Sequence, residues 1–316
     1  MSEFNLIAKY FTRPSQHADL GVGDDAALLR VRSGQQLAIS TDMLVAGTHF
    51  FHDAAPYSIG WKSLAVNVSD MAAMGANPRW ATLAIALPEV NEPWLAEFSK
   101  GFFACADAFN VELIGGDTTR GPLTLSVQIM GEVPLGLAIQ RSGAKAGDDI
   151  WVSGTIGSAA LGLAHLQGKV ALAEPTTTHC LTALTMPTPR VALGLALRGI
   201  ANSCIDISDG LTADLSHILK ASNLGAELAL ENIHCDDYLR SHLNDRAIQQ
   251  CILAGGDDYE LLFTAPKSQR QHIQQLSQQL QLSLSLIGET TAQSTLVVKH
   301  HQQTVDLSSK GFDHFG

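Results

Sequence analysis

The segment Leu37–Asp42 reads LAISTD: a short apolar run ends directly in hydroxyl residues and an aspartate. The arrangement recurs in Val111–Asp117 (VELIGGD) and in Cys204–Asp209 (CIDISD). Short apolar runs bounded by polar and glycine residues are typical of buried strands. Because α/β proteins bind ligands beyond the carboxyl ends of such strands, we predict an α/β fold with a polar site where these strands end.

Helix-like and strand-like segments follow one another along the chain. Helical spacing predicts helices at 58–73, 94–109, 158–167, 189–198, 211–221 and 268–280. Strand patterns occur at 27–31, 37–40, 80–87, 111–114, 124–133, 150–153, 204–207, 259–264, 282–287 and 295–299. The polar, glycine-punctuated stretch 136–149 marks a boundary, so we expect two α/β domains, 1–138 and 139–316, with a mixed order of elements.

The composition describes a globular protein, with 46% hydrophobic and 16% charged residues among 316. A net charge of -11 argues against a nucleic-acid partner, because such binding needs clustered Lys and Arg. The five cysteines lack CxxC spacing and suit reduced thiols. The N-terminal MSEFNLIAKYF has no apolar signal region, and no apolar run approaches the roughly 20 residues of a membrane span. We expect a cytoplasmic protein without a membrane partner.

Six short stretches carry aspartates beside glycine or hydroxyl residues. They are GVGDDA (21–26), STD (40–42), NVSD (67–70), GGDTTRG (115–121), IDISDG (205–210) and GGDDYE (255–260). Carboxylate, hydroxyl and carbonyl oxygens are the ligands of hard divalent cations such as Mg²⁺. If the stretches meet in space, they gather several Mg²⁺ ions, and several cations imply a highly anionic substrate.

A simpler interpretation makes Asp42, Asp117 and Asp209 the N-caps of helices that follow them. Three such caps, each beside Ser, Thr or Gly, are harder to explain in this way than one. GVGDDA also matches the G-x-G-x-x-A of dinucleotide-binding proteins, but that fingerprint follows a strand and opens a helix, and here a strand-like stretch follows instead. SGTIGS (153–158) could cradle an anion at a helix N-terminus, with an ordinary strand-to-helix turn as the competing interpretation.

Asp70 is the most informative single residue of the acidic set. It lies late in an apolar helix, one turn after Asn67, where the helix dipole disfavours a carboxylate by about 0.3–1 kcal/mol. A buried carboxylate needs a cation or a hydrogen-bond donor. We interpret Asp70 as a metal ligand, and a salt bridge to Arg79 or Lys62 is the alternative.

Taken in order, eight motifs closely resemble the thiamine-monophosphate kinase family. They are GVGDDAALL, ISTDMLVAGTHF, AVNVSDMAAMGA, LIGGDTTRGP, RSGAKAGD, IDISDGL, GGDDYEL and KGFDHF. The resemblance implies that ATP and Mg²⁺ convert thiamine monophosphate to thiamine diphosphate. It also implies the two-domain aminoimidazole-ribonucleotide-synthetase-like (PurM-like) fold, of the α+β type with mixed sheets. Residues 1–138 would bind metal and ATP and form a homodimer through the N-terminal strands.

The resemblance also assigns site residues. Metal ligands would be Asp25, Ser40, Thr41, Asp42, Asp70, Asp117, Asp206 and Asp209; ATP contacts would be Gly116, Asp117, Arg141 and Ser208; substrate contacts would be His49, Asp257 and Phe312. The family usually reads GGEDYE where this chain reads GGDDYE, so the shorter Asp257 would reach the thiamine moiety differently. His49 and His52 could pair on zinc, but no third histidine or nearby cysteine completes such a site.

The chemistry needs no catalytic side chain. Two polyanions must be brought into line, and phosphoryl transfer is catalysed chiefly by positioning and charge neutralisation, which Mg²⁺ ions supply. Because the attacking phosphate oxygen is already anionic, we expect direct in-line transfer without a general base or a phosphoenzyme. The alternatives are a selenophosphate-synthetase-like enzyme, whose family has a reactive Cys or selenocysteine near the N-terminus, and a non-catalytic ATP-binding regulator. The first cysteine here is Cys105, in a predicted helix.

Overall fold

The computed structural model describes residues 2–305. Within this range the chain forms two compact units. Unit 1 consists of residues 2–71 and 76–136, and unit 2 of residues 72–75 and 137–305. No helix in the described range is long and apolar enough to cross a membrane.

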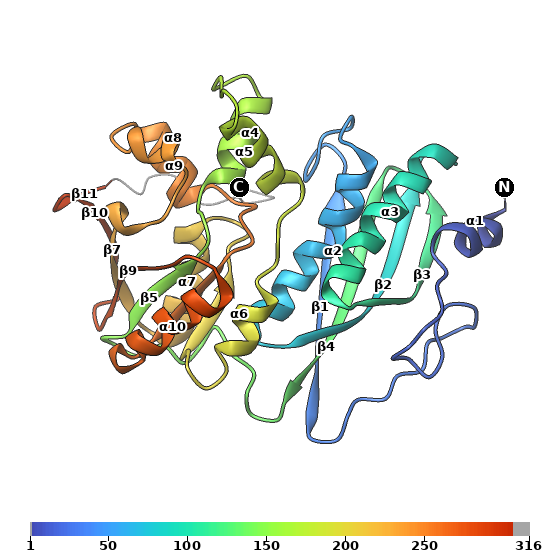
Figure 1. Cartoon of the computed structure of the whole chain (residues 1–316), viewed down its shortest axis with the longest axis horizontal. Coiled ribbons are helices and arrows are strands. Elements are labelled where there is room, and N and C mark those ends of the chain that lie inside the picture. Colours follow the sequence, from blue (N-terminus) through green and yellow to red (C-terminus); the bar gives the residue numbers. More distant parts are fainter. Residues whose placement is uncertain (1, 306–316) are drawn as a thin grey trace. The chain divides into compact units, whose positions relative to one another are not determined.

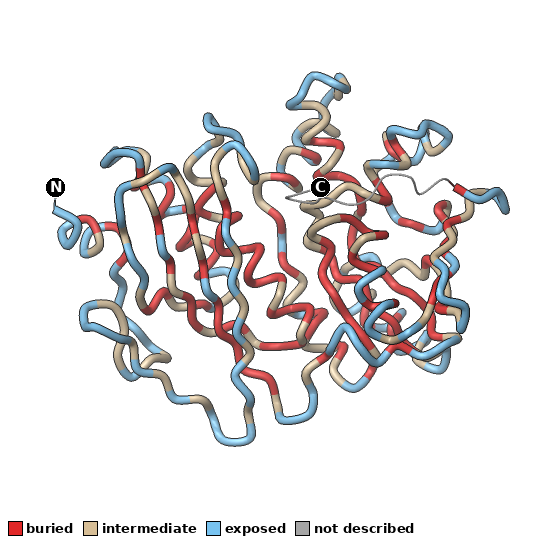
Figure 2. The backbone as a smooth tube through the Cα atoms, turned by 180° about the vertical axis from the view of Figure 1, so that it is seen from behind, coloured by how far each residue is buried: buried red, intermediate tan, exposed pale blue. Residues whose placement is uncertain are grey.

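Unit 1 is a mixed sheet with two long helices, α2 and α3, on one face (Figure 1). Its elements are α1 (Glu3–Tyr10), β1 (Gln35–Val45), α2 (Pro56–Ala73), β2 (Asn77–Leu87), α3 (Glu92–Phe109), β3 (Glu112–Arg120) and β4 (Thr124–Pro134). The strand order is β1-β4-β2-β3, in which β4 is antiparallel to β1 and β2, and β3 is parallel to β2. Every second residue of β2 from Ala81 to Leu87 is buried, which is the period-two pattern of a strand with one face on a core. In Figure 2 the buried residues gather in the helices and strands, and the loops are mostly exposed.

The backbones of α2 and α3 approach each other closely at two glycines. A Cβ atom on Gly60 would lie 2.1 Å from the carbonyl oxygen of Phe98, and one on Gly101 would lie 1.9 Å from that of Tyr57. Any larger residue would push the helices apart, so these glycines fix the position of α2 in unit 1.

The segment between α1 and β1 is held by two carboxylates of the sheet. Glu112 of β3 accepts hydrogen bonds from the backbone N–H groups of Gln16 and His17, and buried Glu132 of β4 accepts one from Arg32. The strand predicted at 27–31 is wrong: only an isolated bridge joins Leu28 to Leu20. Ala27 and Leu29 pack on side chains of β2, β3 and β4, but the backbone of the stretch joins no strand ladder.

Unit 2 is built around a second mixed sheet, of order β11-β10-β7-β9-β5-β8-β6. Its strands are β5 (Asp149–Ser153), β6 (Ser203–Asp206), β7 (Gly225–Ala229), β8 (Leu261–Ala265), β9 (Leu284–Thr291), β10 (Leu296–His300) and β11 (Gln303–Thr304). Its helices are α4 (Ser158–Leu166), α5 (Thr176–Thr185), α6 (Val191–Ala196), α7 (Leu211–Ser222), η1 (Leu230–Asn232), α8 (Asp237–Ser241), α9 (Arg246–Ala254), η2 (Lys267–Gln269) and α10 (Arg270–Leu280).

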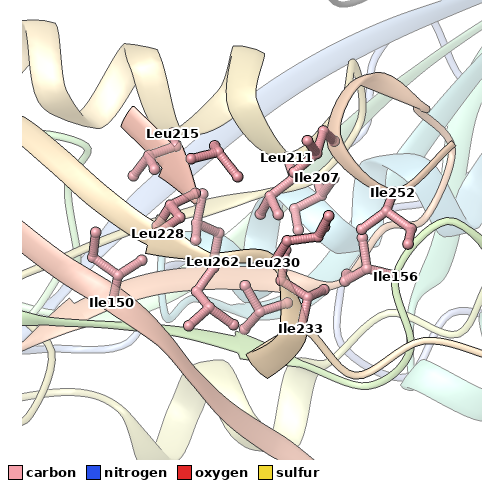
Figure 3. Close-up of a cluster of buried hydrophobic side chains, with 14 of the residues drawn as sticks. Ile150, Ile156, Ile207, Leu211, Leu215, Leu228, Leu230, Ile233, Ile252 and Leu262 are labelled. Atoms are coloured by element: carbon pink, nitrogen blue, oxygen red, sulfur yellow. The ribbon is translucent and has the colours of Figure 1, made fainter. Parts of the chain in front are cut away.

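The central strands of this sheet are covered on both faces. Ile150 and Val152 of β5 belong to one apolar cluster with α4, α7 and α9 (Figure 3), whereas Trp151 between them belongs to a second cluster with α6 and α10. This explains why β5 and β8 are buried along their whole length. Continuous apolar runs are typical of strands covered on both faces.

The long predicted helices and most predicted strands are confirmed, with two informative differences. First, β1 continues to Val45 and β3 to Arg120, so Asp42 and Asp117 lie inside strands and not beyond their ends. The prediction that these two aspartates follow the ends of their strands is wrong, because the backbone ladder continues through polar residues that interrupt the apolar pattern. Second, α5, α8, α9, β7 and β11 were not predicted. The elements α8, β7 and β11 are only five, five and two residues long, too short to show a period, whereas the spacing of buried Ile248 and Ile252 could have indicated α9.

Candidate functional site

In unit 1, polar residues of β1 face α2. Ser40 Oγ donates a hydrogen bond of 2.6 Å to Oδ2 of Asp70, and the backbone N–H of Asp42 donates one of 3.1 Å to Oδ1 of Asn67. Because β1 is an edge strand, its outward N–H needs such a partner. Asn67 is fully buried, so the predicted polar patch on an apolar helix exists and meets the hydroxyl and carboxylate residues of β1. Arg79, an alternative partner for Asp70, lies 3.8 Å from Glu132.

The register of the sheet separates Asp117 from Asp42. Asp42 pairs with Val127 and Val127 with Leu83, and both apolar residues are buried against the core. Asp117 pairs with exposed Ala84, the next residue of β2, whose side chain points to the other face. Within unit 1, therefore, Asp42 and Asp117 lie on opposite faces of the sheet.

Two other predicted residues of this sheet have clear local roles. Thr41 is exposed and its Oγ1 accepts a hydrogen bond of 3.5 Å from Gln128, on the face opposite to Ser40 and Asp42. Gly116 has φ +150°, and a Cβ there would lie 1.9 Å from the carbonyl oxygen of Leu83. Only glycine fits this position, whatever its contact with a ligand.

His49 is held in one tautomer. Its Nδ1 accepts a hydrogen bond of 2.9 Å from the backbone N–H of Val45. Since a backbone N–H can only donate, Nδ1 carries no proton and the neutral ring has its proton on Nε2. His49 can therefore offer an N–H donor to a ligand through Nε2.

Asp25 lies in an exposed turn. Its own backbone N–H donates to the Oδ1 of the neighbouring Asp24 at 3.0 Å, and both side chains are accessible. Phe312 lies outside the described residues. Among residues 2–305 no three His, Cys, Asp or Glu side chains form a group that could hold a metal ion by themselves.

In unit 2, the loop after β6 is tied to a buried carboxylate. The backbone N–H groups of Ser208, Asp209 and Gly210 all donate to Oδ2 of Asp214, at 3.0, 3.1 and 3.1 Å. Burial raises the pKa of Asp214 to about 7, although the N–H groups act in the opposite direction. Sequence reasoning missed Asp214; its place one turn into a helix that begins after a glycine resembles a capping position and could have indicated it.

The GGDDYE stretch supplies two further supports that sequence reasoning missed. The carboxylate of Asp258 accepts hydrogen bonds from the N–H groups of Gly157 (2.8 Å) and Ala159 (3.4 Å), at the N-terminus of α4. Burial raises the pKa of Asp258 well above its ordinary value. The N-terminus considered as an anion cradle is thus occupied by the chain's own carboxylate, which favours the ordinary strand-to-helix turn.

Glu260 makes the second support. Its carboxylate forms a two-fold hydrogen-bonded pair with Arg190, with one N–H···O distance of 2.7 Å, and accepts a bond of 2.5 Å from Ser153 Oγ. The hydroxyl of Ser153 in turn accepts from the backbone N–H of Leu261 at 2.9 Å. The stretch is therefore fixed at two of its three carboxylates, Asp258 and Glu260.

Next to these supports, the backbone places Asp257 beside the loop after β6. The N–H of Asp257 donates to the carbonyl of Ser208 (2.9 Å), and that of Tyr259 donates to the carbonyl of Ile207 (2.8 Å). Asp257 and Tyr259 have φ of 69° and 49°. Residues other than Gly seldom adopt this backbone region, which costs of order 1–3 kcal/mol for each residue. Three predicted residues, Ser208, Asp209 and Asp257, are thus brought together in unit 2.

Asp206 and Arg141 lie at different ends of β6. Asp206 is its buried last residue and leads into Ser208 and Asp209. Exposed Arg141 follows Gln140, whose carbonyl accepts a hydrogen bond from Cys204 near the start of the strand. Within unit 2 the structure therefore does not bring Arg141 to the loop after β6.

Comparison with known proteins gives one consistent result. Residues 23–133 match the family "AIR synthase related protein, N-terminal domain" and residues 145–301 match its C-terminal domain. The thiamine-monophosphate kinase of Salmonella typhimurium is 47% identical over 318 residues, covering 99% of this chain and 98% of the relative.

Solved structures agree in fold. The crystal structure of the thiamine-monophosphate kinase of Stenotrophomonas maltophilia has a TM-score of 0.85 at 45% identity, covering 94% of this chain and 95% of that chain. A structure described as AaThiL complexed with AMPPCP and TMP has a TM-score of 0.79 at 30% identity, covering 90% of this chain and 89% of that chain. The chain therefore belongs to the thiamine-monophosphate kinase family, a family of enzymes with the two-domain PurM-like fold.

Proposed function

We propose that this protein transfers the γ-phosphoryl group of ATP to thiamine monophosphate and forms thiamine diphosphate. The observation that carries the proposal is the full-length similarity, at 47% identity, to a thiamine-monophosphate kinase. The relative bound to AMPPCP and TMP, at 30% identity, shows both kinds of ligand on one such fold. The roles predicted for domains 1–138 and 139–316 stay predictions.

The residues present suit Mg²⁺ in their chemistry. Ser40 with Asp70 in unit 1, and Asp206 with Asp209 in unit 2, offer only oxygen donors. Mg²⁺ is usually held by one or two carboxylates, several waters and substrate phosphates, and seldom by an all-protein cage. The small carboxylate groups of each unit fit this mode of binding. Bound Mg²⁺ would neutralise charge on the phosphate oxygens.

The remaining side chains bind and orient. His49 can donate from Nε2 to a substrate oxygen, and Ser208 and Asp209 stand on a loop whose backbone is fixed by Asp214. No general base is required, since the acceptor phosphate is already an anion at neutral pH. We infer direct in-line transfer without a phosphoenzyme.

We also infer that β1 joins two copies of the chain. Leu37, Ile39 and Met43 are exposed on β1, on the face away from α2, at every second or fourth residue. Isolated exposed apolar residues are common, but an apolar stripe along an edge strand favours association. Light scattering of the purified protein should give twice the chain mass. Ile39→Glu should lower it to one chain mass; a wild-type monomer would refute the inference.

The activity is tested directly. Purified protein with ATP, Mg²⁺ and thiamine monophosphate should yield thiamine diphosphate and ADP, and chelation of Mg²⁺ should stop the reaction. The same protein with selenide and ATP should yield no selenophosphate. Product from selenide alone, or binding of ATP without any product, would replace the proposal by one of its two alternatives.

A further inference from the structure

The loop Ser208–Gly210 directs its N–H groups at a single atom. All three donate to Oδ2 of Asp214 at distances between 3.0 and 3.1 Å. Because the N–H groups converge, the directions of the three peptide planes are fixed together.

The carbonyl side of the same segment is held independently. Ser208 and Ile207 accept hydrogen bonds from the N–H groups of Asp257 and Tyr259. A Cβ on Gly256 would lie 2.2 Å from the carbonyl oxygen of Ser208, so the two backbones are in direct contact. The loop is thus fixed on one side by Asp214 and on the other by the backbone of 256–259.

The ends of the loop are anchored in the apolar core of unit 2. Ile207 and Leu211, which flank it, are fully buried and lie in one cluster with Ile156 and Ile252 (Figure 3). Core packing therefore fixes where the loop begins and ends. It leaves the path between these ends to be set by hydrogen bonds.

Asp214 does more than cap α7. A capping residue inside a helix reaches back to the N–H of the N-cap residue, which here is Gly210. Asp214 also accepts from Ser208 and Asp209, which lie before the helix and have no part in its hydrogen bonding. A buried carboxylate is costly, and cap formation alone explains only one of its three bonds.

We propose that Asp214 is a positioning residue, whose carboxylate holds the loop so that Ser208 and Asp209 present their side chains to the bound nucleotide and its Mg²⁺. This inference rests on the proposed function. Asp214 itself contacts no ligand in this proposal. Its effect is exerted through the backbone of the loop.

The test compares Asp214→Ala and Asp214→Asn with wild type in the full-length chain. Amide hydrogen exchange of the segment 206–211 is measured without ligand, and AMPPCP binding is measured by calorimetry at fixed Mg²⁺. Loss of the acceptor should speed exchange of the three amides and raise the AMPPCP Kd, each by about tenfold or more, the size of one to two lost hydrogen bonds. The Asn variant, which keeps a neutral oxygen acceptor, should lie between wild type and Ala in both measurements.

Asp149→Ala is the matched control. Asp149 is also a buried carboxylate of unit 2, but it bonds the side chain of Arg270, at 2.6 and 2.7 Å. This variant should lower the Tm and leave AMPPCP binding and exchange of 206–211 unchanged. Equal loss of AMPPCP affinity in Asp149→Ala and Asp214→Ala, in step with Tm, would reduce Asp214 to a structural residue and overturn the proposal.

Three other outcomes would also overturn the proposal. If Asp214→Ala does not fold, Asp214→Asn must still exchange faster than wild type, and identical exchange overturns the proposal. If wild type binds no AMPPCP with Mg²⁺, the proposal falls together with the proposed function. If wild type forms thiamine diphosphate and Asp214→Ala matches it in exchange and in Kd, only the positioning role falls.

Discussion

The two units orient their acidic residues by different means. In unit 1, Ser40 and Asp42 belong to β1 and Asp70 belongs to α2, so the hydrogen-bond ladders of regular structure direct their side chains. In unit 2, Asp209 and Asp257 stand on loops. The paths of those loops are set by the side chains of other residues.

The loops of unit 2 need buried polar groups to hold them, and burying these groups costs free energy. A strand directs alternate side chains through its register and needs only packing to stay in place. A loop needs polar anchors. Asp214 and Glu260 are buried and Asp258 is partly buried, so these carboxylates lose hydration. The stability of unit 2 should therefore be sensitive to loss of an anchor, and that of unit 1 to loss of helix packing. Turnover should be sensitive to loss of the acidic ligands themselves.

The largest effect on stability should come from removing the Glu260 anchor. Glu260→Ala leaves the partly buried Arg190 without its partner and Ser153 without its acceptor, so unfolding should become easier by about 3–5 kcal/mol in urea denaturation. Asp107→Ala breaks the exposed pair with Arg13 in unit 1 and should cost no more than about 1 kcal/mol. Equal costs for the two variants would remove the distinction between a buried anchor and a surface pair.

The acidic residues of unit 1 should affect turnover and not stability. Asp42→Asn or Asp70→Asn should reduce kcat at limiting Mg²⁺ by about 100-fold or more, because a charge that neutralises phosphate oxygens through the metal is lost. In Asp70→Asn the side-chain amide oxygen could still accept from Ser40, so the free energy of unfolding should change by less than about 1 kcal/mol.

Asp107→Asn serves as the control for both, since it removes an exposed acid of the same unit. It should keep wild-type turnover at every Mg²⁺ concentration. Near wild-type turnover of Asp42→Asn at limiting Mg²⁺ would refute the assignment of Asp42 as a ligand.

Packing of α2 on α3 can be tested at Gly101. Alanine is favoured over glycine in a helix by about 1 kcal/mol, but a Cβ here would meet the carbonyl oxygen of Tyr57 at 1.9 Å. Overpacking of this kind costs about 1–3 kcal/mol, so Gly101→Ala should lower the Tm. In Gly121→Ala the nearest atom is 3.4 Å away, and the Tm should hardly change. A Tm of Gly101→Ala at or above wild type would show that the helices can separate without loss.

Much of the fold could be predicted from apolar spacing alone. The helices α3, α7 and α10 and the strands β2 and β4 were found because each buries a face with a regular period, and α2 because of its long apolar run, which is buried on nearly all sides. The ends of β1 and β3 were missed. Polar residues interrupt the apolar pattern, at Ser40–Asp42 in β1 and from Asp117 onward in β3, and only pairing with a neighbouring strand shows that the ladder continues.

The candidate site shows the same limit. Carboxylates beside glycine and hydroxyl residues pointed to Ser40 and Asp70, which do meet, and to the loop with Asp209. Nothing in the sequence shows whether an aspartate binds a ligand or a backbone. Within GGDDYE, Asp258 caps a helix that begins 100 residues earlier, a contact that only the folded chain reveals.

The smallest expected effect is the pH dependence of stability that comes from buried thiols. The two units should behave alike in this respect, because the effect depends on burial and not on anchoring. Burial raises the pKa of Cys180 in unit 2 to about 12, and burial also raises the pKa of Cys105 in unit 1. A thiol whose folded pKa lies above its unfolded pKa contributes stability that is complete below the unfolded value and is lost as the pH rises toward the folded value. For Cys180 the loss begins near pH 9, where an unfolded thiol titrates.

Between pH 9 and 10, each such thiol should lower the free energy of unfolding by about 1 kcal/mol. Cys180→Ala and Cys105→Ala should therefore each flatten the pH dependence by that amount, measured in urea with reductant present. The change in slope, not the absolute stability, is the readout, since either variant also leaves a small cavity. Removal of a buried thiol should thus have the same effect in both units, whereas the effects of Glu260→Ala and Gly101→Ala should differ. A flattened slope in only one unit would mean that the thiol of the other unit becomes exposed before unfolding, and the contrast between the units would then extend beyond their carboxylates.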